Sequence, residues 1–266
     1  MGKLFISIKK LFCSQKEKGS LTIIAVGPGD PSLLTIEATK ALKKSKVIFY
    51  PISGDDNGSN SAQIVNKFIK KKKQIPLIFP MGRKEYDSAL IWKSGAKKIV
   101  DYINRNLPVA LLCLGDTSIY ASSFYIKKEI KKNYPQIKIT TLPGISSLSL
   151  AAALADFQLI KKGENLNILE CPDDKNQFLN LINKQSKTVL AIMKVGKRWE
   201  WVKFALEEKK LLRKAILAVN LGMENQYIGD ASEYVSKELP YFSLLLLRIG
   251  LEAVSYTHLT LPTRLS

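Results

Sequence analysis

Residues 21–31 read LTIIAVGPGDP and join a short apolar, β-branched run to a loop of glycine and proline. A run of this kind is typical of a buried parallel strand, which Gly27 would end. Asp30 can cap a following helix with Pro31 at its first position, where the missing N–H costs nothing. Apolar residues then recur at helical spacing over residues 33–42. The segment predicts a strand followed directly by a helix.

The same alternation continues through the chain and predicts an α/β fold. In the first half, helices are expected at 88–104 and 119–133, with a lysine-rich helix before residue 75, and further strands at 47–50, 75–79, 109–114 and 137–142. In the second half, helices are expected at 146–154, 175–183 and 200–208, and strands at 166–170, 188–193, 215–220, 226–229 and 242–247. Because the last three strands follow one another closely, we expect the second sheet to be mixed.

Four segments follow from this pattern: an N-terminal extension at 1–20, α/β lobes at 21–140 and 141–250, and a tail at 251–266. The tail lacks the periodicity of the lobes, so we interpret it as non-native. The extension has neither the apolar stretch of a signal peptide nor a myristoylation signal, since residue 6 is Ile. No apolar run approaches the roughly 18 residues that span a bilayer. We therefore expect a soluble, cytoplasmic protein.

Charge and residue types restrict the chemistry. Lys and Arg outnumber Asp and Glu 41 to 23, which attracts polyanions such as nucleic acid, anionic lipid or a polycarboxylate. Runs such as residues 70–73 can equally be solvated helix ends, so charge alone does not identify a partner. Cys13, Cys113 and Cys171 show no metal or disulfide spacing and suit a reducing compartment. His258, in the tail, is the only histidine, which argues against a histidine base, a Ser-His-Asp triad or a His-ligated zinc. We expect no metal site.

Four segments could form a ligand site. Residues 27–31 lack the third glycine of a dinucleotide fingerprint, because Ser32 stands there. Residues 114–120 follow a strand, where ligands of open α/β sheets collect, so Asp116 could accept hydrogen bonds from a cofactor or cap the next helix. Residues 143–147 (PGISS) begin another helix, and 192–194 (IMK) end a strand. Taken singly, residues 27–31 are better explained as a tight structural turn and Met193 as a core residue.

In this order, and with residues 241–244 (YFSL) at the end, the segments resemble the tetrapyrrole methylases over residues 21–249. Five features resemble the precorrin-2 C20-methyltransferase branch of that family: residues 48–51 (IFYP), 79–81 (FPM), Trp92, 113–116 (CLGD) and 241–243 (YFS). The resemblance implies a class III methyltransferase, usually a homodimer, whose S-adenosylmethionine lies in a cleft between two α/β lobes. It would methylate a corrin-pathway intermediate, either precorrin-2 or cobalt-factor II.

Cofactor contacts implied at the matching positions are Pro28, Leu114, Gly115, Asp116, Ile119, Ser146, Ser147, Met193 and Gly222. Asp30 matches an aspartate with a proton-accepting role in uroporphyrinogen-methylating relatives. Thr117 departs from the proline that the family commonly has after Gly-Asp. Methyl transfer from a sulfonium to an electron-rich carbon is mainly a positioning task, in keeping with the missing histidines. The many carboxylates of the substrate suggest rim contacts at Arg83, Lys84 and Lys194.

Two other classes stay open. An enzyme of the same fold could act on another precorrin position, on ribosomal RNA or in diphthine synthesis, and the basic charge would suit RNA. Against RNA, the sequence shows no interleaved aromatic and arginine residues of the kind that stack on single strands. A non-catalytic binding protein on this fold is the third hypothesis, and a failure to bind S-adenosylmethionine would favour it.

Overall fold

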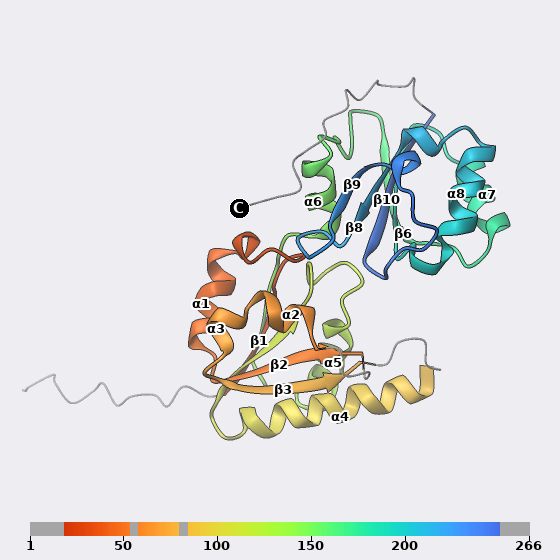
Figure 1. Cartoon of the computed structure of the whole chain (residues 1–266). Helices are drawn as coiled ribbons and strands as arrows, with labels where there is room; N and C mark the ends of the chain where they lie inside the picture. Colours follow the sequence, from red (N-terminus) through yellow and green to blue (C-terminus); the bar gives the residue numbers. More distant parts are fainter. Residues whose placement is uncertain (1–18, 54–57, 80–84, 251–266) are drawn as a thin grey trace, which may run out of the picture. The chain divides into compact units, whose positions relative to one another are not determined.

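The computed structural model describes residues 19–53, 58–79 and 85–250, which form two compact units (Figure 1). Unit 1 contains the chain up to Val26 and residues 34–144, and unit 2 contains residues 27–33 and the chain from Ile145 onward. The predicted tail, residues 1–18 of the predicted extension, and Met81, Arg83 and Lys84 lie outside the described residues. Each unit has its own five-stranded sheet, so the α/β prediction is confirmed.

The sheet of unit 1 is wholly parallel, with the order β3-β2-β4-β1-β5. Its strands are β1 (Ser20–Ala25), β2 (Val47–Ile52), β3 (Lys73–Ile78), β4 (Pro108–Cys113) and β5 (Ile139–Leu142). The apolar runs of β1 and β4 are buried because helices cover both faces of the sheet. Helices α4 (Glu85–Ile103) and α5 (Ser123–Asn133) lie on one face, and α1 (Ile36–Lys44), α2 (Asn60–Ile64) and α3 (Asn66–Ile69) on the other.

Three helix predictions in unit 1 were wrong in their details. Asp30 does not cap α1: its carboxylate accepts the Ser32 N–H at 2.7 Å and supports only the short 3₁₀ turn Pro31–Leu33. Thr35 is the actual cap, accepting the Ala38 N–H at 3.1 Å. Helix α5 begins at residue 123 rather than 119, because Tyr120 takes a left-handed φ of 49° that interrupts a helix. The single lysine-rich helix is instead the pair α2 and α3.

The lysine run at residues 70–73 is more than a solvated helix end. The Lys72 ammonium donates to three carbonyl oxygens at the end of α1, those of Leu42, Lys43 and Ser45, at 2.7, 2.8 and 2.6 Å. Burial, followed by the neighbouring charge of Lys46, lowers the pKa of Lys72. A cation at the carboxyl end of a helix satisfies carbonyls that have no partner within it. Lys72 thereby ties α1 to the chain entering β3.

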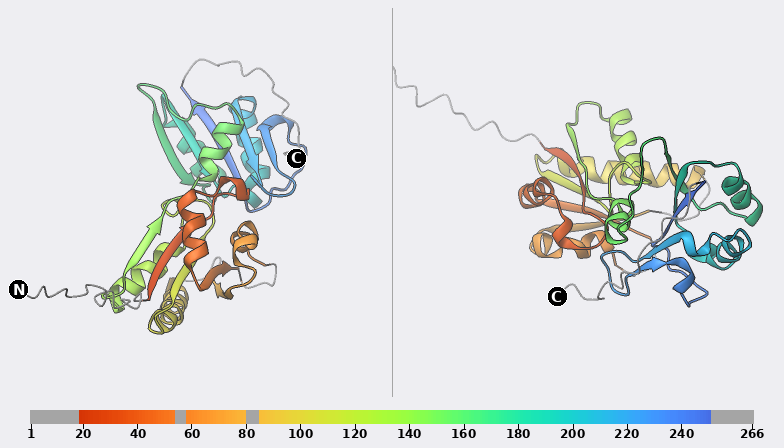
Figure 2. Two further views of the ribbon diagram at one scale, coloured as in Figure 1. Left: turned by 90° about the vertical axis from the view of Figure 1, so that its left-hand side faces the viewer. Right: turned by 90° about the horizontal axis from the view of Figure 1, so that it is seen from above.

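The sheet of unit 2 is mixed, as predicted, with the order β6-β7-β10-β8-β9. Its strands are β6 (Asn165–Glu170), β7 (Thr188–Met193), β8 (Ala215–Val219), β9 (Tyr227–Asp230) and β10 (Ser243–Ile249). Strands β6, β7 and β8 run in one direction, and β9 and β10 in the other. Helices α7 (Lys175–Asn183) and α8 (Trp199–Glu208) pack on one face and α6 (Ser147–Leu154) on the other, as Figure 2 also shows. Within the described ranges, no helix has both the length and the apolar character needed to cross a membrane.

Candidate functional site

In unit 1 the candidate residues lie where β4 ends. Leu114, Gly115, Asp116 and Ile119 form one loop between β4 and α5. Gly115 has a φ of +70°, and a Cβ added there would meet nothing within 4 Å. The positive φ therefore favours glycine, and the missing side chain leaves open space over the main chain. A ligand could approach this backbone closely.

The Asp116 carboxylate joins this loop to the chain leaving β5. One oxygen accepts the N–H of Ser118 at 2.8 Å as well as its hydroxyl, and the other accepts the N–H of Gly144 at 2.9 Å. Burial alone would raise the pKa of Asp116, but the hydrogen bonds from Gly144, Ser118 and Thr117 outweigh it, so the pKa is lowered. Asp116 is thus an ionised group already engaged with its own protein.

Gly144 allows the two loops to meet. A Cβ at this position would lie 2.6 Å from the Ala25 Cβ and 2.8 Å from the Gly115 carbonyl oxygen, which no real side chain tolerates. Only glycine lets the chain pass between β1 and the Gly115 backbone while presenting its N–H to Asp116. We call this arrangement of Gly115, Asp116 and Gly144 the carboxylate clamp.

In unit 2 a second pair of loops meets through bare backbone. A Cβ on Gly29 would lie 2.5 Å from the Leu221 oxygen, and one on Gly222 would lie 2.5 Å from the Asp30 nitrogen. Gly222 also has a φ of +70°, and its N–H donates to the Gln226 side chain at 2.7 Å. This contact brings the segment that carries the predicted residues Pro28 and Asp30 next to the predicted residue Gly222. We call it the glycine contact.

Met193 lies at the same edge of the second sheet, because it ends β7 just as Val219 ends the parallel-running β8. The next residue, Lys194, has a left-handed φ of 58° and forms an ion pair of 3.0 Å with Glu170 at the end of β6. Beyond it, the Gly196 N–H donates to the buried Ser243 hydroxyl at 2.7 Å. Ser243, from the closing YFS segment, therefore anchors the loop that follows Met193.

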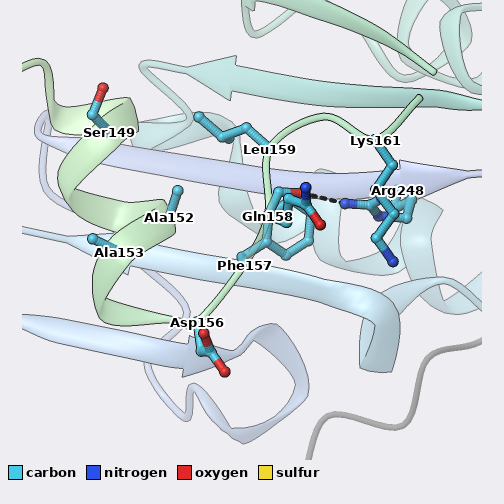
Figure 3. Close-up of a pocket in the computed structure, with 9 residues that line it drawn as sticks. All are labelled: Ser149, Ala152, Ala153, Asp156, Phe157, Gln158, Leu159, Lys161 and Arg248. Atoms are coloured by element: carbon cyan, nitrogen blue, oxygen red, sulfur yellow. Dashed lines mark hydrogen bonds between the residues drawn. The ribbon is translucent and has the colours of Figure 1, made fainter. Parts of the chain in front are cut away.

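Ser146 and Ser147 begin α6. The Ser146 hydroxyl accepts the Ser149 N–H at 3.1 Å, so it caps the helix. At the far end of α6, the Gln158 carbonyl accepts a hydrogen bond from Arg248, which pairs with Val189 near the start of β7 (Figure 3). The chain four residues beyond α6 is therefore held near the start of β7.

A cavity of about 550 Å³ lies along one side of α6 and beside the chain that follows it (Figure 3). Its lining includes Ser149, Ala152, Phe157, Lys161 and Arg248, but none of the predicted cofactor contacts. The Arg248 guanidinium is already held by the buried Glu164 carboxylate and lies over the Phe157 ring at 5.1 Å. We therefore place the candidate cofactor site at the loop edges and not in this cavity.

The structure brings the predicted residues into two groups. Unit 1 gathers four of them in the loop after β4. In unit 2, the segment with Pro28 and Asp30 meets Gly222, Met193 ends β7, and Ser146 and Ser147 begin α6. Sequence reasoning missed the roles of Gly29, Gly144 and Ser243, although all three stand in the quoted motifs. For Gly29 and Gly144 the available signal was the glycine itself, because glycine allows another part of the backbone to approach closely. The partner of each glycine is distant in sequence and could not be identified.

Neither buried cysteine suits thiolate chemistry. Burial raises the pKa of Cys113 to about 11 and that of Cys171 to about 12. Among the residues that the structure describes, no three His, Cys, Asp or Glu side chains are grouped closely enough to hold a metal ion.

Comparison with protein families identifies the chain's relatives. The model of the tetrapyrrole (corrin/porphyrin) methylases matches residues 20–234. The chain belongs to the tetrapyrrole methylase family. It is thus a methyltransferase of a family that uses S-adenosylmethionine as its methyl donor.

Two relatives of this tetrapyrrole methylase are similar to it along most of their own lengths. Identity is 25% to the precorrin-2 C(20)-methyltransferase of Sinorhizobium sp, covering 86% of this chain and 94% of the relative. It is 22% to the cobalt-precorrin-2 C(20)-methyltransferase of Salmonella typhimurium, covering 86% and 95%. The crystal structure of a cobalt precorrin-4 methyltransferase superimposes with a TM-score of 0.62 at 16% identity, covering 88% of this chain and 97% of that one. The structural match confirms the predicted tetrapyrrole methylase fold.

Proposed function

We propose that this methyltransferase transfers a methyl group from S-adenosylmethionine to C20 of precorrin-2, or of its cobalt-loaded counterpart, in cobalamin biosynthesis. One observation carries the proposal: relatives named for this reaction match almost end to end, over 94% and 95% of their own lengths. One of the two is named for the metal-free acceptor and the other for the cobalt-loaded one, so both acceptors are included. A homodimer is part of the proposal, on the family resemblance alone.

The two loop edges supply the proposed cofactor contacts. Open space over the Gly115 backbone suits a ligand that binds through main-chain groups. With its carboxylate already bound to Gly144, Asp116 would act mainly by holding this backbone in place. The proposed contacts are Pro28, Leu114, Gly115, Asp116, Ile119, Ser146, Ser147, Met193 and Gly222.

S-adenosylmethionine supplies an activated methyl group, so the side chains need mainly to orient donor and acceptor and exclude water. Loss of a proton from the methylated macrocycle requires one acceptor. Asp30 offers a half-buried carboxylate at the glycine contact, with one oxygen fixed by the Ser32 N–H. We propose that Asp30 accepts this proton. Lys194, at the same edge of unit 2, would meet a substrate carboxylate.

An anaerobic assay tests the proposal. The purified protein is incubated with S-adenosylmethionine and either precorrin-2 or cobalt-factor II, and S-adenosylhomocysteine and product mass are followed. Gain of one methyl, assigned to C20 by NMR with a ¹³C-labelled methyl donor, is the expected result. A methyl at another ring position would refute the C20 assignment and retain the tetrapyrrole substrate. No binding of S-adenosylhomocysteine by calorimetry would refute the cofactor site.

Asp30→Asn separates the proton-accepting role from binding. The amide keeps the shape and an acceptor for Ser32 but cannot take up a proton. We expect at least a tenfold fall in kcat with little change in the Kd for S-adenosylhomocysteine. Asp156→Asn, at a turn elsewhere in unit 2, is the matched control. Unchanged kcat in Asp30→Asn would assign the proton to water.

A further inference from the structure

A line of aromatic side chains runs from the core of unit 1 to its surface. Phe79, just after β3, is buried and meets Trp92 of α4 edge to face, with ring centroids 4.9 Å apart. Trp92 stacks on Tyr125 of α5, with centroids 5.3 Å apart and planes 13° apart. Tyr125 in turn meets Phe124 at 6.3 Å. Two separate sequence features, Phe79 and Trp92, are thus parts of one cluster.

The outer members of this cluster are unusually exposed. Phe124 is 60% and Tyr125 is 51% exposed, although large aromatic side chains gain from burial. Packing of α4 on α5 accounts for only part of this arrangement. The two helices meet closely at Gly95, where a Cβ would come within 2.9 Å of the Ile126 side chain, and the Tyr125 ring also stacks on Trp92. Helix packing nevertheless leaves Phe124 and half of Tyr125 exposed.

The cluster lies on the side of unit 1 where its parallel strands end. Phe79 follows β3 directly, and Phe124 and Tyr125 form the first turn of α5, at the end of the loop that leaves β4. Ligands of open α/β sheets collect at this edge. The carboxylate clamp belongs to the same loop, with Asp116 only nine residues before Tyr125.

Exposed lysines flank the aromatic surface. Lys93 follows Trp92 on α4, and Lys128 lies one helical turn beyond Phe124 on α5. A flat ligand that stacks on the Tyr125 ring, meets the Phe124 ring edge to face and carries carboxylates at its periphery would satisfy both parts of this surface. A tetrapyrrole macrocycle has this combination of a planar π-system and peripheral carboxylates.

We infer that Tyr125 is the ring on which the substrate macrocycle stacks, with Trp92 stacked behind it, Phe124 flanking it edge to face, and Lys93 and Lys128 facing the carboxylates of the macrocycle. We call these three aromatic residues the aromatic platform. This inference rests on the proposed function, because it assigns a substrate contact to that reaction. Nucleic acid, which also combines flat rings with negative charge, is the competing occupant. The platform residues contact substrate and are not proposed to bind the methyl donor.

Phe124→Ala and Tyr125→Ala test the platform against Phe204→Ala. Phe204 is a matched control because it is 59% exposed, also lies on a helix, and belongs to unit 2. For each platform variant we expect about a tenfold rise in KM for precorrin-2, as loss of one aromatic contact commonly produces. The Kd for S-adenosylhomocysteine should not change. Tyr125→Phe should restore KM, and Phe204→Ala should match the wild type.

A binding measurement that does not depend on turnover keeps the two proposals separate. Uroporphyrin III, an air-stable macrocycle with peripheral carboxylates, is titrated while tryptophan fluorescence is followed, with and without a single-stranded RNA competitor. Binding that weakens about tenfold in Tyr125→Ala and Phe124→Ala supports the platform, even if wild-type protein fails to methylate precorrin-2. Wild-type turnover with unchanged KM and macrocycle affinity in both variants would overturn the platform and leave the proposed function intact. Displacement of the macrocycle by RNA at lower concentration would assign the surface to RNA instead.

Discussion

The carboxylate clamp of unit 1 and the glycine contact of unit 2 solve the same problem by different means. Both hold together loops at the carboxyl ends of strands. In unit 1 a charged side chain, Asp116, reaches across to the Gly144 N–H at 2.9 Å. In unit 2 the chain at Gly29 packs directly on Gly222, with no room for a Cβ. The first is directional and depends on ionisation, whereas the second depends only on the absence of side chains.

This difference determines how each site should fail. A hydrogen-bonded carboxylate can be lost in steps, because each bond contributes separately and water can replace part of it. A backbone contact without free space cannot be lost in steps, since the smallest added group already overlaps main-chain atoms that cannot rotate away. Substitutions at the glycine contact should therefore destabilise the protein more than substitutions at the carboxylate clamp.

Gly222→Ala has the largest expected effect. The new Cβ would lie 2.5 Å from the Asp30 nitrogen, on a residue with a φ of +70°. We expect a loss of about 4 kcal/mol in the free energy of unfolding of unit 2, together with loss of S-adenosylhomocysteine binding. Urea unfolding in a Trp92→Phe background measures it, because the remaining tryptophans, Trp199 and Trp201, both belong to unit 2.

Gly163→Ala is the control for Gly222→Ala. Gly163 has a similar φ of +83°, but a Cβ there would meet nothing within 4 Å. Only the left-handed conformation is penalised, by about 1 kcal/mol. Equal losses in the two variants would show that conformation, and not close contact, accounts for the glycine at position 222.

Asp116→Ala should have an intermediate effect. It removes the acceptor of the Gly144 N–H and of the Ser118 N–H and hydroxyl, and we expect a loss of about 2 kcal/mol. Hydrogen exchange of the β1 and β4 amides reports it within unit 1. Asp101→Ala, exposed on α4, should change stability by no more than about 0.5 kcal/mol. If the two variants behave alike, the clamp contributes nothing measurable.

Ser243→Ala should have a smaller effect, of about 1 kcal/mol, because it removes one acceptor, that of the buried Gly196 N–H. Unfolding followed by Trp199 and Trp201 fluorescence measures it. Ser236 also makes hydrogen bonds but is exposed, so water can replace its hydroxyl in Ser236→Ala. A loss in Ser236→Ala as large as that in Ser243→Ala would argue against a special role for burial.

Periodicity in the sequence predicted most of both sheets, including the mixed character of the second, because apolar runs and strand spacing are local signals. Lys175–Asn183 and Thr188–Met193 have the predicted bounds. Helix starts were less predictable where two caps compete. Asp30 was predicted to cap α1, but its carboxylate accepts the Ser32 N–H in the preceding turn and Thr35 caps the helix.

The candidate site was predictable as a set of loops but not as a set of contacts. The resemblance named Asp116 and Gly222, yet the partners Gly144 and Gly29 are 28 and 193 residues away in the chain. Nothing local in the sequence pairs them, because the pairing follows from strand order. Lys72 shows the same limit, since its capping role depends on where α1 ends.

A pH series on Asp116→Asn tests the electrostatic half of the comparison most directly. Hydrogen bonds from Gly144, Ser118 and Thr117 offset the effect of burial and hold the pKa of Asp116 below its unfolded value of about 3.9. The folded state therefore favours the ionised form, and this stabilisation is present above about pH 4 and is lost as the pH falls through the folded pKa. The stability difference between wild type and Asp116→Asn should be constant from pH 5 to 7 and shrink as the pH falls below about 4. Because Gly222 has no side chain to titrate, the deficit of Gly222→Ala should not narrow over the same range. A difference between wild type and Asp116→Asn that persists unchanged at pH 2 would mean that the shape of the carboxylate, and not its charge, holds the clamp together.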